Sequence, residues 1–97
     1  MELDRFHRGE REYLESLVRS HGHIVLKVAR RFGEDEDHTL DLIQETWIQV
    51  LEKRTTFKGS GAFEAWLHRV ATRVSSSTLD RARAALPAGL LDDPLAT

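Results

Sequence analysis

The spacing of hydrophobic positions predicts helices along most of the chain, with none of the strict alternation that marks a half-buried strand. A short helical segment covers residues 2–8, and a longer one covers residues 10–20. Helical spacing resumes over residues 24–32 and stops at Gly33, a residue type that often ends a helix. Between these stretches, the His-Gly pair at residues 21–22 predicts a break or a bend.

A further helix is predicted after the acidic segment 34–37, with Asp37 as its N-cap and an end near Arg54. Its expected buried face carries the apolar residues Leu40, Ile43, Trp47, Val50 and Leu51. Its other faces carry polar residues: Asp41, Gln44, Glu45, Gln49 and Glu52.

The last helix follows a loop at residues 57–61, in which Ser60 is the expected helix cap. We expect this helix to run as far as Ala85, before Pro87 and Gly89. Its buried positions have helical spacing: Phe63, Leu67, Val70 and Val74.

The predicted fold class is therefore all-α, a compact bundle of about four helices. Residues 1–85 form the helical domain, and residues 86–97 are expected to be a linker or tail. Trp47 and Trp66 are expected to be core residues, because large aromatic side chains contribute most when they are buried.

Length and composition limit the class of protein. The 97 residues suffice for one domain, and the absence of cysteine excludes disulfides and thiolate metal sites. No strictly apolar run exceeds three residues, and the N-terminus is rich in charge. Neither a membrane span nor a signal peptide is predicted, so we expect a cytoplasmic protein with no membrane partner.

Charge is unevenly distributed, although the net charge is only −2. Residues 34–52 carry seven acidic side chains and no basic one, whereas residues 53–85 carry seven basic and two acidic side chains. One interpretation is two surfaces with different partners. The other is that the two blocks neutralise one another across a helix interface.

Patterns of catalysis and metal binding are missing from the sequence. The five histidines lack the spacing of a zinc site, and no serine lies in a nucleophile-elbow motif. The Lys-Gly-Ser-Gly segment at 58–61 is too short for a phosphate-binding P-loop. We therefore expect a protein that is not an enzyme and that uses no metal and no cofactor.

A basic stripe on the last helix favours binding instead. Its arginines fall within about 160° of the helix circumference: Arg69, Arg73, Arg81 and Arg83. Together with Lys58 in the preceding loop, the stripe is typical of a site for a phosphate backbone and an unstacked base. A solvated basic face is the alternative interpretation.

Several segments together resemble one family. Residues 41–47, DLIQETW, are similar to the D-L-x-Q-E-x-[FW] stretch of region 2.2 in the extracytoplasmic-function (ECF) sigma factors of the sigma-70 family. Residues 57–67, FKGSGAFEAWL, are similar to the F-x-G-x-x-x-F-x-x-W-L of these proteins, and HRVA at 68–71 follows like their x-R-I-A. The resemblance covers about residues 4–85.

This resemblance implies roles for particular residues. Asp41, Gln44 and Glu45 would dock on the clamp helices of the β′ subunit of core RNA polymerase. The loop would receive a base flipped from the non-template single strand of the −10 promoter element, and the start of the last helix would follow that strand. The implied DNA-binding residues are Phe57, Lys58, Gly59, Ser60, Gly61, Arg69 and Arg73.

The function implied is that of a transcription initiation factor domain that binds core RNA polymerase and melts the −10 element. The alternative is a protein-interaction module of the same fold, the target of an anti-sigma factor, without DNA binding. Where the family often has Arg-Asn, this chain has Thr72 and Arg73. Members of the family also carry a C-terminal region 4, which we expect to be absent from this chain.

Overall fold

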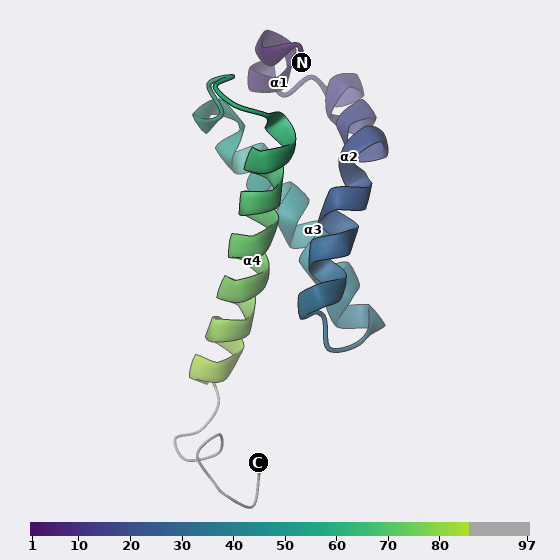
Figure 1. The fold of residues 1–97 in the computed structure, drawn as a ribbon, viewed down its shortest axis with the longest axis vertical. Helices are drawn as coiled ribbons and strands as arrows, with labels where there is room; N and C mark the ends of the chain where they lie inside the picture. The colour runs from purple at the N-terminus through teal and green to yellow at the C-terminus, as the bar shows by residue number, and fades with distance from the viewer. Residues whose placement is uncertain (86–97) are drawn as a thin grey trace, which may run out of the picture.

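The computed structural model describes the backbone of residues 1–85 and the side chains of residues 1–77. Within that part of the chain, the fold consists of helices α1 (Leu3–Arg8), α2 (Arg11–Phe32), α3 (Glu36–Lys53) and α4 (Phe63–Ala85) (Figure 1). A single turn of 3-10 helix, η1 (Arg54–Thr56), follows α3. The prediction of an all-α bundle of about four helices is confirmed.

The three long helices pack against one another, and α1 lies at one end of the bundle. Figure 1 shows α1 beside the loop that joins α3 to α4, at the end where α4 begins. The arrangement therefore gathers the N-terminus, the start of α2 and this loop at the same end of the molecule.

All four helices and the loop after η1 contribute to one hydrophobic core. Its buried members are Phe6, Leu17, Val25, Val50, Phe57, Phe63, Leu67, Val70 and Val74. The four positions predicted on α4 are among them, so that prediction is confirmed. Trp47 and Trp66 pack against this core but remain half-buried.

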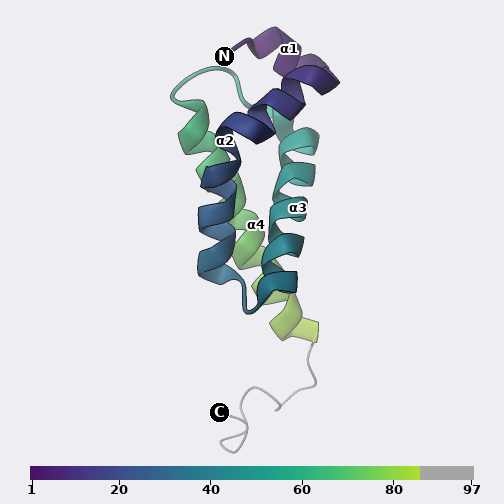
Figure 2. The same ribbon diagram turned by 90° about the vertical axis from the view of Figure 1, so that its right-hand side faces the viewer.

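Helix α2 continues without a break through His21 and Gly22, so of the expected break or bend the break is wrong. Glycine costs about 1 kcal/mol relative to alanine within a helix. In α2 this cost is offset by packing on both sides of Gly22, where Leu17 and Val25 are buried. Figure 2 shows the first turns of α2 inclined to the later ones, so the helix bends along its course.

The N-cap of α3 is Asp35, two residues before the predicted Asp37. Asp35 Oδ1 accepts a hydrogen bond of 2.8 Å from the backbone N–H of His38. Glu36 and Asp37 then occupy the first turn, where negative charge interacts favourably with the helix dipole. The prediction of Asp37 is wrong because several neighbouring acidic residues could serve as a cap.

The buried face of α3 is centred on Leu42, Thr46 and Val50, of which only Val50 was predicted, while the predicted Ile43 and Trp47 are partly buried against the core. Thr46 is only 1% exposed, and its hydroxyl donates a 2.7 Å hydrogen bond to the carbonyl of Leu42. This bond satisfies the hydroxyl and allows a polar residue in the core. Leu40 and Leu51, which we expected to be buried, are 56% and 41% exposed.

Helix α4 begins at Phe63, so Ala62 precedes it and the predicted Ser60 cap is wrong. Its predicted end at Ala85 is confirmed. The side chains of Arg81 and Arg83, and the predicted tail at 86–97, lie outside the described residues. None of the helices in the described part combines the length and the apolar character needed to cross a bilayer.

Candidate functional site

Asp41 and Gln44 lie on the solvent side of α3, as the sequence predicts, but Glu45 does not. Glu45 is half-buried at the boundary with α4. Its Oε1 atom accepts a hydrogen bond of 3.5 Å from Gln49 Nε2. The three residues therefore divide into an exposed pair and a third residue at the contact between two helices.

Exposed apolar side chains accompany Asp41 and Gln44. Ile48 is 40% exposed, similar to Leu51. Five residues of α3 fall within about 100° of the helix circumference, and we call them the α3 seam: Leu40, Asp41, Gln44, Ile48 and Leu51. A helix face that mixes apolar anchors with acidic groups is suited to docking against helices of another protein.

The loop between η1 and α4 depends on two glycines. Gly59 and Gly61 have φ angles of +85° and +79°, in the left-handed region that other residues rarely adopt. Lys58 and Ser60 lie between and beside them and are exposed. The loop therefore presents a cation and a hydroxyl on a backbone whose shape requires glycine.

Phe57 differs from the other predicted loop residues because it lies in the core, at 5% exposure. Its ring packs near those of Phe6, Phe63 and Trp66, at centroid distances of 6.4, 5.6 and 5.5 Å. Phe57 is thus an anchor that holds the exposed part of the loop. Its burial does not favour the expectation that Phe57 contacts a ligand at the surface.

Helix α1 contacts the backbone of Phe57 through a hydrogen bond. His7 Nε2 lies 2.6 Å from the carbonyl oxygen of Phe57, and Arg54 Nε donates a 2.9 Å hydrogen bond to the carbonyl of His7. Sequence reasoning missed His7 and Arg54, because these partners are 50 and 47 residues apart along the chain. No periodicity of a single helix could have revealed them.

A cleft of about 640 Å³ opens between the loop, the N-terminus and α2. Its lining includes Lys58, Gly59, Tyr13, His21 and Glu64. His21 Nε2 lies 3.2 Å from Glu64 Oε1. The pKa of the Glu64 carboxyl is lowered. The largest cause is a hydrogen bond from the backbone N–H of Glu64 itself, and the second is the hydrogen bond with His21.

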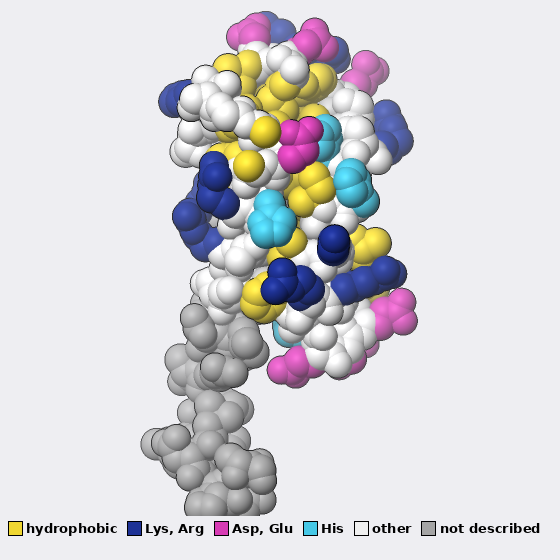
Figure 3. Space-filling view, viewed as in Figure 1, with side chains coloured by type: hydrophobic (Ala, Val, Ile, Leu, Met, Phe, Trp, Pro, Cys, Tyr) yellow, Lys and Arg dark blue, Asp and Glu magenta, His cyan; other side chains and the backbone are white. Residues whose placement is uncertain are grey.

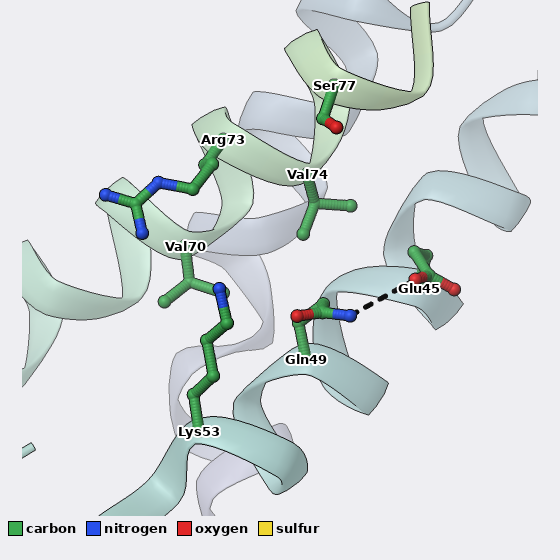
Figure 4. Close-up of a pocket in the computed structure, with 7 residues that line it drawn as sticks. All are labelled: Glu45, Gln49, Lys53, Val70, Arg73, Val74 and Ser77. Carbon is green, nitrogen blue, oxygen red and sulfur yellow. Dashed lines mark hydrogen bonds between the residues drawn. The ribbon is translucent and has the colours of Figure 1, made fainter. Parts of the chain in front are cut away.

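Arg69 and Arg73 are exposed on α4, as expected. Arg73 borders a groove of about 160 Å³ between α3 and α4, which also has Glu45 and Lys53 in its lining (Figure 4). Figure 4 shows Lys53 extending toward α4, while the guanidinium of Arg73 points away from Glu45. The groove thus contains Glu45, which the sequence predicts to contact polymerase, and Arg73, which it predicts to contact DNA.

Among the side chains of residues 1–77, no ion pair joins the acidic block to the basic block. Among the described side chains, the pairs joining Arg to Asp or Glu all lie within residues 2–15, and His21–Glu64 joins α2 to α4. Figure 3 shows Lys and Arg side chains spread over the face formed by α2 and α4. Of the two interpretations of the charge blocks, separate surfaces are therefore favoured.

Metal binding finds no support in the geometry of residues 1–77. No three side chains of His, Asp or Glu gather there in an arrangement that could hold an ion. What the described surface offers is an acidic and apolar face on α3, a glycine-shaped loop and exposed arginines on α4. This combination defines a binding domain with two distinct surfaces.

Comparison with known proteins identifies the class. Residues 17–85 match the family described as sigma-70 region 2, and the chain therefore belongs to this family. The chain is 30% identical over 77 residues to the RNA polymerase sigma-H factor of Pseudomonas aeruginosa. That match covers 79% of this chain and 40% of the relative.

Two further relatives carry the ECF name. The ECF RNA polymerase sigma factor SigE of Mycolicibacterium smegmatis is 37% identical over 60 residues, which are 62% of this chain and 23% of the relative. The ECF RNA polymerase sigma-E factor of Escherichia coli K12 is 27% identical over 77 residues, 79% of this chain and 40% of the relative. The chain is thus a region 2 domain of the ECF type, and it spans less than half the length of these relatives. No solved structure matches it.

Proposed function

We propose that residues 1–85 bind core RNA polymerase through the α3 seam and capture the non-template single strand of the −10 promoter element through the loop and α4. The observation that carries the proposal is the exposed, glycine-shaped loop anchored by Phe57 and followed on α4 by the exposed Arg69 and Arg73, in a chain of the sigma-70 region 2 family. Residues 86–97 are proposed as a linker or tail.

The DNA part of the proposal needs no catalytic group. Taking a base out of the stack costs a few kcal/mol, and binding of the flipped base and its strand offsets that cost. Lys58 and Ser60 supply a donor and a hydroxyl for the base edge, while Arg69 and Arg73 supply positive charge for phosphates. Recognition and melting would then be one binding event.

The polymerase part rests on the α3 seam. Leu40, Ile48 and Leu51 are apolar side chains exposed to solvent, and Asp41 and Gln44 lie between them on the same face. Apolar anchors favour a buried contact centre, and a carboxylate with an amide supplies direction and register. The β′ clamp helices of core RNA polymerase are the proposed partner of this face.

The first experiment tests docking. The double variant Asp41→Ala, Gln44→Ala should retain its helical circular dichroism, because exposed positions usually change stability by less than about 0.5 kcal/mol. Its binding to core RNA polymerase should fall at least about tenfold, the effect of about 1.4 kcal/mol. Glu12→Ala removes the same net charge from an exposed position of α2 and is the matched control. Wild-type affinity in the double variant would refute docking through this face.

The second experiment separates two kinds of DNA contact by fluorescence anisotropy with −10 strands varied one base at a time. Lys58→Ala and Ser60→Ala should change the ranking of bases. Arg69→Ala and Arg73→Ala should weaken all strands alike and reduce the salt slope by about 0.7 per lost phosphate contact. If the arginine variants change the base ranking and the loop variants do not, the assignment is reversed. If no strand binds even at low salt, a protein-interaction module, such as an anti-sigma target, replaces the DNA proposal.

A further inference from the structure

A second groove lies between the C-terminal half of α2 and α4, apart from the loop. It has a volume of about 380 Å³ and is lined by His23, Ile24, Lys27, Val28, Arg31 and His68. Val28 is 2% exposed and forms an apolar floor, while Lys27, Arg31 and both histidines are exposed at the rim. None of the lining residues is acidic.

Two cations and a histidine form a regular row on α2. His23, Lys27 and Arg31 follow one another at four-residue intervals, so they lie along one side of the helix about 6 Å apart. The like charges of Lys27 and Arg31 repel one another at this spacing. Among the described ion pairs, none supplies Lys27 or Arg31 with a carboxylate. An anionic ligand of extended shape would relieve the repulsion.

This groove is continuous with the surface of α4. His68 also lines a shallow depression that contains Arg69, Thr72 and Arg73. His68 thus lines both the α2–α4 groove and the depression that holds the arginines proposed to follow the DNA strand. Figure 3 shows histidine side chains lying between the Lys and Arg side chains on this face.

We infer that the phosphate backbone of the bound strand continues past Arg69 and His68 into the α2–α4 groove, where Lys27 and Arg31 contact phosphates. The inference rests on the proposed DNA function and extends its footprint from α4 to α2. A nucleic acid fits better than an acidic protein segment for two reasons. The two cations lie on the same side of α2, and the groove that they line continues through His68 into a surface already suited to phosphates.

The test compares two double variants of the 97-residue chain. Lys27→Ala, Arg31→Ala removes the groove cations. Arg19→Ala, Arg30→Ala removes the same charge from exposed positions of α2 that do not line the groove. Each is titrated by fluorescence anisotropy, over a series of salt concentrations, with a short strand that reaches only the loop and a longer strand that extends past α4.

With the longer strand, the groove variant should lose about 1.4 of the salt slope, at about 0.7 for each of two phosphate contacts. With the short strand it should behave like wild type. The Arg19, Arg30 variant should keep the wild-type slope with both strands. Circular dichroism should be unchanged in all cases, because these side chains are exposed.

Other outcomes overturn the inference in distinguishable ways. If the two double variants bind the longer strand equally, the groove is not part of the DNA path, while the proposed function stands. If wild type binds neither strand at low salt, the DNA function fails and the inference fails with it. If polyglutamate binding depends on Lys27 and Arg31 while the DNA salt slope does not, an acidic protein segment is the ligand of the groove.

Discussion

Phe6 offers the sharpest test of how the loop is held. It is completely buried, although it comes from a helix of only six residues. Its ring meets those of Phe63, Trp66 and Phe57 edge-on, at centroid distances of 5.4, 5.9 and 6.4 Å. This one side chain therefore joins α1 to both the loop and the start of α4.

The expected cost of Phe6→Ala follows from its burial. Truncating a buried phenylalanine to alanine typically costs about 3–5 kcal/mol. At about 0.05–0.15 kcal/mol per residue, a chain of 97 residues has a total stability of about 5–15 kcal/mol. The variant should therefore lose about a fifth or more of the free energy of unfolding. Phe6→Leu retains most of the volume and should lose less than about 1.5 kcal/mol.

Urea unfolding followed by circular dichroism measures both variants, with the slope m checked to confirm that the transition stays two-state. A loss below about 1 kcal/mol for Phe6→Ala would show that α1 is not docked on the bundle in solution. Anchoring of the loop through Phe6 would then be wrong.

Three further predictions concern single side chains. Ser75 is 1% exposed and its hydroxyl has no hydrogen-bond partner, so Ser75→Ala should stabilise the domain by about 1 kcal/mol in urea unfolding, and the exposed Ser77→Ala should change little. Asp35→Ala should cost about 1 kcal/mol and Asp37→Ala clearly less; equal losses would contradict the cap assignment. Hydrogen bonds from Arg8 and then Arg5 lower the pKa of Glu10 below its ordinary 4.5, so its stabilisation is present above pH 4.5 and is lost as pH falls through the lowered value. Glu10→Gln should therefore lower the urea midpoint at neutral pH and match wild type in strong acid.

The sequence predicts α4 better than α3 for a physical reason. On α4 the apolar residues Phe63, Leu67 and Val70 stand on one stripe among polar neighbours, so only one face can be buried. On α3, apolar residues occur on nearly every side, and periodicity alone cannot choose among them. The true core face includes Thr46, a polar residue that only its bond to the carbonyl of Leu42 makes compatible with burial.

The sequence likewise predicts only part of the candidate site. Gly59 and Gly61 mark the loop in the sequence, because their left-handed conformations require the residue type itself. The cleft beside the loop and the α2–α4 groove depend on which helices become neighbours. His21 and Lys27 lie on a helix far from the loop in sequence, so their contribution emerges only from tertiary packing.

The α3 seam also has a consequence for the behaviour of the free domain. Its apolar side chains stay in water until a partner covers them, and Val18 of α2 is exposed as well, at 43%. Val18 and Leu51 line the same apolar groove, so the uncovered surface spans two helices. Exposed apolar area of this kind promotes self-association, which increases as the concentration rises. The same exposed area should therefore limit the solubility of the free domain, and a seam variant such as Leu51→Glu should remain monomeric to higher concentration in sedimentation experiments.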